Sequence, residues 1–389
     1  MGYKSRLTEV RYLQGVRWTR RVLIGIAVLV VLAALAVDIV HRQDRTGIDF
    51  HTYLAAARVG LHQGWAQIYD QQIVAQEQKQ LVPYLWSQPF LSPPTVAWLV
   101  APFSGLPYDS AYNVWALFTF ALFACALAWA AAGQGWSRWI AVAGALSPWW
   151  VMHSVNVGQV VPLVAASTVV AWRLLRERHD VAAGLVLSAV LLKPNTAVLV
   201  PLALLVAGRP RAFAAWFGAA ACIALAAAAM LGPHGTSAYL AQLRGPLPTG
   251  ADGLTLHGAF GIAGWSVTLI RLGIVAAVLA SAYKLRGAAG LVIPVAILGS
   301  LLVAPYLHAS DLCLLSAAGW MVWQERPAAA WRVALASLWV LANPYLFIGG
   351  VAPTLIRWPV FELGLLAAIV LAAWQPLTAR ADLRSRAPA

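Results

Sequence analysis

Hydrophobic residues form long runs along the chain, and short polar or basic segments separate these runs. The first run extends from Val22 to Val40, directly after Arg17, Arg20 and Arg21. At about 1.5 Å per residue it is long enough to cross the roughly 30 Å hydrocarbon core of a bilayer. The pattern predicts a retained first membrane helix over 22–40, with the arginine cluster on the cytoplasmic side.

Further apolar runs follow over most of the chain. They lie near residues 92–104, 111–132, 138–152, 158–175, 181–207, 212–232, 262–283, 289–304, 310–323, 329–348 and 359–376. Neither an internal repeat nor a long linker divides them. The sequence therefore predicts an all-α, polytopic integral membrane protein that forms a single domain over 1–389. We expect about 10–12 membrane helices, including short re-entrant ones.

Composition supports a membrane protein and excludes several other classes. Of the residues, 61% are hydrophobic and 11% are charged, whereas soluble domains have roughly 45–50% and about 25%. These values exclude an ordinary soluble enzyme and a disordered chain. The net charge of +13 comes from basic residues at the ends of apolar runs, which is the positive-inside pattern and not that of a nucleic-acid-binding domain. We expect a lipid bilayer as a partner and no nucleic acid.

The basic segments indicate which side of the membrane each connection faces. They are residues 173–178, 209–211, 284–286, 326–332 and the C-terminal tail. By the positive-inside rule, all of them and both termini should be cytoplasmic, in a plasma-membrane protein. Residues 41–91 and 233–261 are then extracytoplasmic loops, and connections of this length are usually functional.

The run at 181–207 conflicts with simple alternation, because it alone separates two basic segments. The conflict disappears if the run is a re-entrant hairpin whose tip, Lys193-Pro194-Asn195, faces a cavity lined by protein. The same alternation of membrane crossings requires 138–152 to be a short outer helix that ends at Ser147-Pro148. In the alternative topology both runs cross the membrane fully, and 173–178 lies outside.

Asp49 stands a few residues beyond the first predicted helix. At Phe50 an amphipathic helical pattern begins, which predicts a helix lying along the membrane interface. Two interpretations of Asp49 remain open. Its side chain caps the N-terminus of this helix, or it is a carboxylate at the boundary of water and lipid that acts as a general base.

Two polar residues stand out within apolar surroundings. Gln159 begins an apolar helix, where it either caps backbone amides or donates hydrogen bonds to a phosphate or sugar. Lys193 interrupts an apolar run, where a lysine costs roughly 2.5–3.5 kcal/mol on insertion scales. This side chain either snorkels to the interface, neutralises a lipid phosphate or pairs with a carboxylate.

His308 and Asp311 are three residues apart, and they share a face if the segment is helical. They form either a hydrogen-bonded pair at the interface or a phosphate-binding histidine that the carboxylate keeps charged. The sequence contains no spaced cluster of metal ligands, so we expect neither a metal nor another cofactor.

Nineteen tryptophans are present, and we interpret most of them, including Trp150 and Trp320, as anchors at the membrane interface. Trp86 and the pair Trp149-Trp150 are also candidates for stacking on a sugar ring.

Five short motifs follow one another between residues 49 and 311. They are Asp49-Phe50-x-x-Tyr53-x-Ala55-Ala56, a Pro93-Pro94 helix start, Gly158-Gln159, Lys193-Pro194 and Pro305-Tyr306-x-His308. In this order they resemble glycosyltransferase family 87, which belongs to the GT-C superfamily of polytopic glycosyltransferases. That family includes polyprenol-phosphate-mannose-dependent α-1,2-mannosyltransferases and related polyprenol-phosphate arabinofuranosyltransferases.

The resemblance implies an inverting enzyme that moves a mannosyl residue from polyprenol-phosphate-mannose to a glycolipid or lipoglycan acceptor on the extracytoplasmic face. It implies Asp49 as the catalytic base. The implied donor phosphate and sugar site consists of Tyr53, Gln159, Lys193, Asn195 and His308. Residues 255–260 depart from the family pattern, and His257 in this segment, together with Trp86, is the candidate acceptor-binding position.

The residues agree with this chemistry. A lipid phosphate is a stable leaving group, so cationic stabilisation replaces a general acid, and one carboxylate suffices to deprotonate the acceptor hydroxyl. The alternatives are an arabinofuranosyltransferase and a transporter or flippase for a lipid-linked sugar. A transporter more often shows internal repeats, and a non-catalytic scaffold gives no reason for Lys193 in an apolar run. We therefore expect a transferase.

Overall fold

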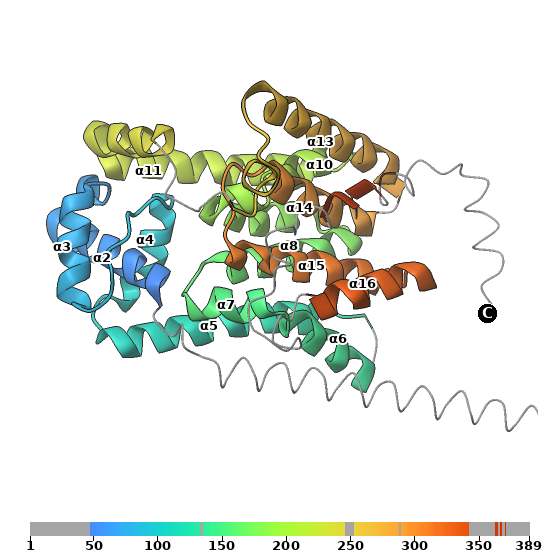
Figure 1. Cartoon of the computed structure of the whole chain (residues 1–389), viewed down its shortest axis with the longest axis horizontal. Coiled ribbons are helices and arrows are strands. Elements are labelled where there is room, and N and C mark those ends of the chain that lie inside the picture. Colours follow the sequence, from blue (N-terminus) through green and yellow to red (C-terminus); the bar gives the residue numbers. More distant parts are fainter. Residues whose placement is uncertain are drawn as a thin grey trace, which may run out of the picture.

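All regular structure is helical in the residues that the structure, a computed structural model, describes (Figure 1). These are residues 47–132, 135–245, 253–287, 289–341, 362–364, 366–367 and 370. The all-α prediction is therefore confirmed for this part of the chain. The predicted first membrane helix at 22–40 and most of the run at 359–376 lie outside the described residues.

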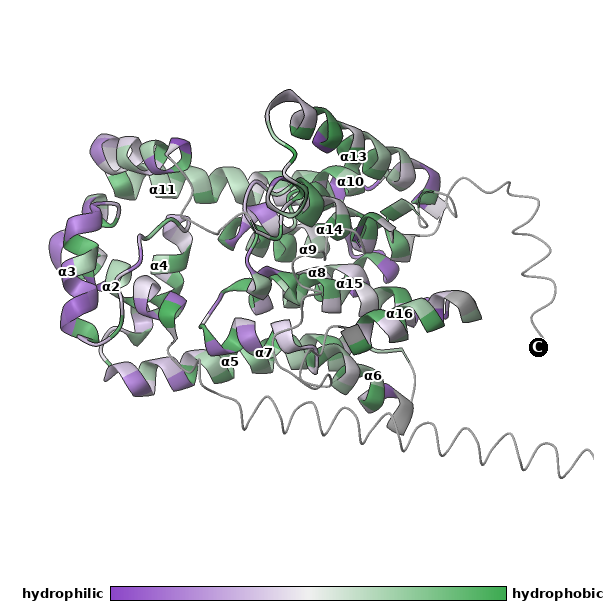
Figure 2. Cartoon of the chain, viewed as in Figure 1, coloured by the Kyte–Doolittle hydropathy of each residue, from purple (hydrophilic) through white to green (hydrophobic). Residues whose placement is uncertain are grey.

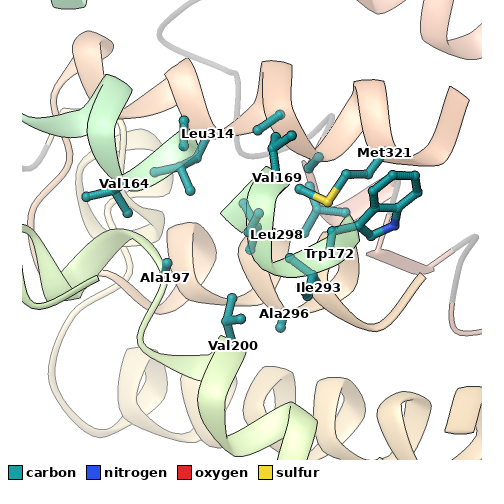
Figure 3. Packing of buried hydrophobic residues seen from close by; sticks show 14 of the residues in the cluster. Val164, Val169, Trp172, Ala197, Val200, Ile293, Ala296, Leu298, Leu314 and Met321 are labelled. Carbon is teal, nitrogen blue, oxygen red and sulfur yellow. The ribbon is translucent and has the colours of Figure 1, made fainter. Parts of the chain in front are cut away.

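The larger hydrophobic core lies between five helices. These are α5 (Tyr108–Ala130), α8 (Val161–Arg176), α10 (Leu199–Val206), α14 (Val292–Val303) and α15 (Cys313–Gln324). Figure 3 shows part of this core, in which Val169 and Trp172 of α8 belong to the same cluster as Ile293 of α14 and Met321 of α15. Nearly all of α14 is buried, as expected for a helix that is apolar on every side.

A smaller core lies at one end of the bundle. It is formed by α2 (Ile48–Gln63), α3 (Gln71–Leu81), α4 (Pro94–Val100) and the first turns of α5 (Figure 1). The expectation of an amphipathic interfacial helix from Phe50 is wrong, because α2 packs against α3 and α4 and is buried continuously from Phe50 to Ala57. The polar helix of this unit is α3 (Figure 2).

Three of the described helices are long and apolar enough to cross a membrane, namely α5, α11 (Pro210–Arg244) and α13 (Gly264–Lys284). Along α11, Phe217 and Leu225 are 59% and 71% exposed. Large apolar side chains exposed in this way suit contact with lipid and not with water. The chain is thus a membrane protein, while its cellular membrane and the side that each terminus faces stay predictions.

The run at 181–207 reverses direction at the predicted position. α9 (Asp180–Val186) continues as a 3₁₀ segment to Leu192, and the chain turns at Lys193-Pro194 before it returns as α10. At the base of this hairpin, Arg209 Nη1 lies 3.0 Å from Asp180 Oδ1. The predicted break at Ser147-Pro148 is also present, since it separates α6 (Trp136–Leu146) from α7 (Trp149–Asn156). How deep either segment lies in a membrane stays a prediction.

The segment expected to be a second outer loop, 233–261, begins as a helix. Helix α11 continues through Pro233 to Arg244, and only Gly232, with φ of 63° and ψ of −175°, interrupts its helical backbone. Proline fits the first turn of a helix, because its missing N–H has no partner there. Gly232 and Pro233 therefore mark a kink between two helical halves and not the start of a loop. The short helix α12 (Leu256–Phe260) follows.

A turn after α7 joins the two cores by meeting the start of α2. The amides of Gly47 and Asp49 donate to the carbonyls of Asn156 and Val157 over 3.2 and 2.9 Å. On the other side of the turn, Trp115 Nε1 of α5 donates to the Gly158 carbonyl over 2.8 Å. Gly158 has φ of +79°, and a Cβ at this position would lie 2.5 Å from Phe50 Cβ. Only glycine satisfies both constraints.

We predict that Gly158→Ala lowers the free energy of unfolding by about 2–5 kcal/mol, because it adds backbone strain and a steric clash with α2. Thermal unfolding of the purified protein in detergent measures the effect. Gly218→Ala on α11 is the matched control, since a Cβ there meets no atom within 4 Å and should change stability by less than about 1 kcal/mol. Equal melting temperatures for the two variants would contradict this account of the turn.

Candidate active site

Four segments that are distant in sequence bring charged side chains together between the two cores. They contribute Asp49 from the first turn of α2, Lys193 from the hairpin tip, and His308 and Asp311 from the segment between α14 and α15. Lys193, His308 and Asp311 are each close enough to Asp49 to shift its pKa. The fourth segment, the turn after α7, contributes Gln159. The structure therefore joins most of the residues predicted as a donor site.

Asp49 is held by a chain of two side-chain hydrogen bonds. Gln159 Nε2 donates to Asp49 Oδ2 over 2.7 Å, and the Tyr53 hydroxyl donates to Gln159 Oε1 over 2.9 Å. Because the hydroxyl contacts the amide oxygen, it directs the amide nitrogen toward the carboxylate. Tyr53 and Gln159 thus contact Asp49 or each other, and their predicted role as direct donor ligands stays untested.

The interpretation of Asp49 as an N-cap is wrong. The cap residue of α2 is Gly47, in a left-handed conformation, and it makes no side-chain cap hydrogen bond. The carbonyls of the turn after α7 already accept the first amides of the helix, so a capping carboxylate is not needed. The Asp49 side chain is instead partly exposed, and this exposure leaves it accessible to a substrate.

Burial among protein atoms raises the pKa of Asp49 above the usual range of aspartate. The Lys193 cation and the Gln159 amide oppose this shift, because both stabilise the charged form. A carboxylate with a raised pKa is a stronger base once it is deprotonated. The arrangement therefore suits proton abstraction better than an ordinary surface aspartate does.

Lys193 forms a buried ion pair with the second aspartate of the site. Its Nζ lies 2.8 Å from Asp311 Oδ1, and the two side chains are only 9% and 0% exposed. The other carboxylate oxygen of Asp311 accepts the His308 backbone amide over 2.9 Å. Of the three interpretations of Lys193, pairing with a carboxylate is confirmed and snorkelling is excluded.

The surroundings of His308 oppose protonation of its ring. Its side chain is solvent-accessible, but the surrounding protein and then the Lys193 cation lower its pKa below the usual histidine range. The Asp311 and Asp49 carboxylates raise the pKa of His308, but these opposing effects are smaller. Phosphate binding by His308 stays a prediction.

Asn195 positions the segment that carries His308. Its Nδ2 donates to the Tyr306 carbonyl over 3.3 Å, and the Tyr306 hydroxyl lies 3.4 Å from Asn195 Oδ1. The hairpin tip thus holds the segment between α14 and α15 through both Lys193 and Asn195. No hydrogen bond links Asn195 directly to Asp49 within the described residues, and its role as a donor ligand stays a prediction.

Several other candidates lie apart from this cluster. Trp86 is 70% exposed in the loop between α3 and α4, and His257 lies on α12, with Nδ1 2.8 Å from the Ile262 carbonyl oxygen. Their role in acceptor binding stays untested. Trp150 and Trp320 are each 4% exposed, and Trp150 donates to Ser316 Oγ over 2.8 Å. These two tryptophans belong to the core, so their interpretation as interface anchors is wrong.

The sequence also contained a signal that the prediction overlooked. Arg271 is the single charged residue in the apolar run 262–283, and its Nη2 donates to the Ala304 carbonyl over 3.1 Å, directly before the segment that carries His308.

The described part of the chain contains no group of three or more His, Cys, Asp or Glu side chains that could hold a metal ion. A reaction without a metal stays a prediction.

A family model described as glycosyltransferase family 87 matches residues 90–344. The chain belongs to this family. Neither the curated proteins nor the solved structures compared with the chain give a match. The protein is therefore a membrane glycosyltransferase. The matched region contains Gln159, Lys193 and His308, whereas Asp49 precedes it and is connected to it through the hydrogen bond from Gln159.

We predict that Lys193→Met lowers the free energy of unfolding by about 3–5 kcal/mol, because it leaves the Asp311 carboxylate buried and unpaired. The double variant Lys193→Met/Asp311→Asn should recover much of this loss, since it removes both charges. Thermal unfolding in detergent distinguishes the variants. As a control, Arg173→Met breaks the exposed pair with Glu177 and should cost at most about 1 kcal/mol. A double variant as unstable as Lys193→Met would contradict the ion-pair explanation.

Proposed function

We propose that this glycosyltransferase transfers a mannosyl residue from polyprenol-phosphate-mannose to a membrane glycolipid or lipoglycan. Asp49 is the general base, and transfer inverts the configuration of the sugar. The observation that carries the proposal is the placement of Asp49: a partly exposed carboxylate, held by Gln159, beside the cationic Lys193 and the accessible imidazole of His308. The apolar helices around this site suit a donor whose polyprenyl chain stays in lipid.

The proposed reaction is a single displacement. Asp49 takes the proton of the acceptor hydroxyl, the resulting oxygen bonds to the anomeric carbon of the sugar, and the bond from this carbon to the phosphate oxygen breaks. The electron pair leaves with the polyprenyl phosphate, which Lys193 and His308 stabilise. Asp311 is bound by Lys193 and by a backbone amide. It is therefore not available as a second, nucleophilic carboxylate of the kind that retaining enzymes use.

The proposal includes the expected setting of the reaction. The site faces the extracytoplasmic side of the plasma membrane, both termini are cytoplasmic, and no metal takes part because a phosphate leaving group needs only cationic stabilisation. His257 and Trp86 remain the proposed acceptor contacts. A polyprenol-phosphate arabinofuranose donor is the alternative substrate, and a screen of radiolabelled polyprenol-phosphate sugars with purified protein decides between the donors. Transport of the donor without transfer to any acceptor would support a flippase instead.

We predict that Asp49→Asn lowers the transfer rate by about 10²–10⁴-fold, the usual contribution of a general base. Folding should be nearly unchanged, because Asn retains a carbonyl oxygen for the Gln159 amide. Incorporation of labelled mannose into membrane glycolipid measures the rate. Asp109→Asn is the matched control, since Asp109 also lies in the first turn of a helix but outside the site. An Asp49→Asn enzyme that retains more than about a tenth of the wild-type rate would exclude Asp49 as the base.

The hydrogen bond from Gln159 makes a further prediction about pH. A base must be deprotonated, so kcat/KM should fall as the pH drops through the pKa of Asp49. The Gln159 amide lowers that pKa by stabilising the carboxylate. Gln159→Leu should therefore raise the pKa and move the acidic limb of the profile to higher pH.

Tyr53→Phe should move the limb in the same direction by a smaller amount, because it removes only the hydrogen bond that orients the Gln159 amide. Tyr69→Phe serves as the control, since the Tyr69 hydroxyl donates to the Ser92 carbonyl and not to Gln159. A limb at the same pH in Gln159→Leu and wild type would show that Asp49 does not limit the rate at acidic pH.

A further inference from the structure

Arg271 is a charged residue that the proposed reaction leaves without a role. It is the single charged residue of α13 before Lys284, and α13 is long and apolar enough to cross a membrane. Arg271 lies seven residues, or about 10 Å at the helical rise, from the first residue of α13. A cation within an apolar membrane helix is costly, and such residues usually mark a functional site.

The guanidinium of Arg271 has more donors than the structure uses. Its Nη2 donates to the Ala304 carbonyl over 3.1 Å, and its Nε is buried without a hydrogen-bond partner. Lys193, Arg176 and Arg209 each have a carboxylate within 4.0 Å, but no ion pair of the described residues includes Arg271. Since a guanidinium has five N–H donors and a permanent charge, it has capacity for an anion.

The surroundings of Arg271 are apolar on one side and polar on the other. Val267 and Ile274 of α13 are buried against the bundle, whereas Leu269 and Leu272 are 66% and 60% exposed. Thr268 lies one turn before Arg271 on the same face and is exposed. A lipid chain therefore has an apolar surface to lie along beside the guanidinium. The Thr268 hydroxyl donates to the Gly264 carbonyl over 3.3 Å, a long hydrogen bond that it would exchange for one to a phosphate oxygen.

Arg271 is also connected to the candidate active site. The Ala304 carbonyl that it binds begins the segment that ends at His308, four residues later. Four residues span at most about 14 Å of extended chain. Within the site, Asp311 offsets part of the charge of Lys193, so a second cation on the membrane side adds to the attraction of Lys193 for an anionic ligand.

We propose that Arg271, together with Thr268, binds the phosphate group of a membrane lipid at the side of the active site. The proposal rests on the proposed function in one respect, since one source of this phosphate is the polyprenyl-phosphate donor. The other source is the head group of a surrounding anionic phospholipid.

Binding measurements with the full-length protein test the proposal. The protein is purified and placed in nanodiscs of phosphatidylcholine, with and without phosphatidylglycerol. Binding of a short-chain isoprenyl phosphate is titrated, and co-purified phosphatidylglycerol is quantified. Arg271→Gln removes the charge but keeps an amide donor for the Ala304 carbonyl. Lys284→Gln, at the opposite end of α13, is the matched control and should behave as wild type.

Two results support the proposal and identify the source. If the donor supplies the phosphate, Arg271→Gln weakens isoprenyl phosphate binding by about tenfold to a hundredfold in both kinds of nanodisc. If a phospholipid supplies it, isoprenyl phosphate binding is unchanged and retained phosphatidylglycerol falls at least severalfold. If Arg271→Gln binds isoprenyl phosphate and retains phosphatidylglycerol as the wild type does, the proposal is overturned, because Arg271 would then only cap the end of α14.

A second pair of variants covers the case in which Arg271→Gln does not fold. Arg271→Lys keeps the charge but loses the planar pair of donors, and Thr268→Val removes the hydroxyl. Each should weaken binding of one of the two ligands severalfold, and wild-type binding in both variants would overturn the proposal. Binding does not depend on catalysis. Inactivity of the wild-type protein with every polyprenol-phosphate sugar would therefore overturn the proposed function and not this site.

Discussion

The geometry of the site depends on how the first backbone amides of α2 are satisfied. The first amides of a helix have no partner within the helix, and leaving them unpaired in an apolar protein costs free energy. Here the Val157 carbonyl accepts the amides of Asp49 and Phe50, and the Asn156 carbonyl accepts that of the cap residue Gly47. Because the backbone supplies these partners, the Asp49 carboxylate in the same turn is not used as a cap. It accepts a hydrogen bond from Gln159 instead, so the turn between α7 and α8 positions this side chain.

The two aspartates of the site have different environments and therefore different chemistry. Asp311 is fully buried, and its two oxygens are bound by Lys193 and by the His308 amide. Asp49 has one neutral donor and stays accessible. Identical groups acquire separate roles in this way when their surroundings differ. The pairing of Lys193 with Asp311 also keeps the hairpin tip in place, so it serves the structure even before a substrate is bound.

The sequence predicted the membrane class, the reversal within 181–207 and the polar residues that the structure brings together, because a polar residue within an apolar run is conspicuous. It did not predict which residues pair. Gln159 and Asp49 are 110 positions apart, and only the packing of α2 against the turn after α7 brings them together. The hydrophobic pattern of a sequence also does not show whether an apolar helix face will contact lipid or other parts of the protein. The burial of α2 and of Trp150 was missed for this reason, and the Gly232-Pro233 kink was mistaken for the start of a loop.

The two hydrophobic cores meet at the site, and this division has a consequence for how such an enzyme diversifies. Asp49 and Tyr53 belong to helix α2 of the smaller core, whereas Lys193 and Asp311 are fixed to the larger bundle. In the proposed mechanism, the base thus comes from the smaller core and the cation that meets the phosphate comes from the larger bundle. The two cores are linked by few shared contacts, such as Leu192, which packs against both. We therefore expect substitutions on α3 and α4 to change the surroundings of Asp49 more than those of Lys193.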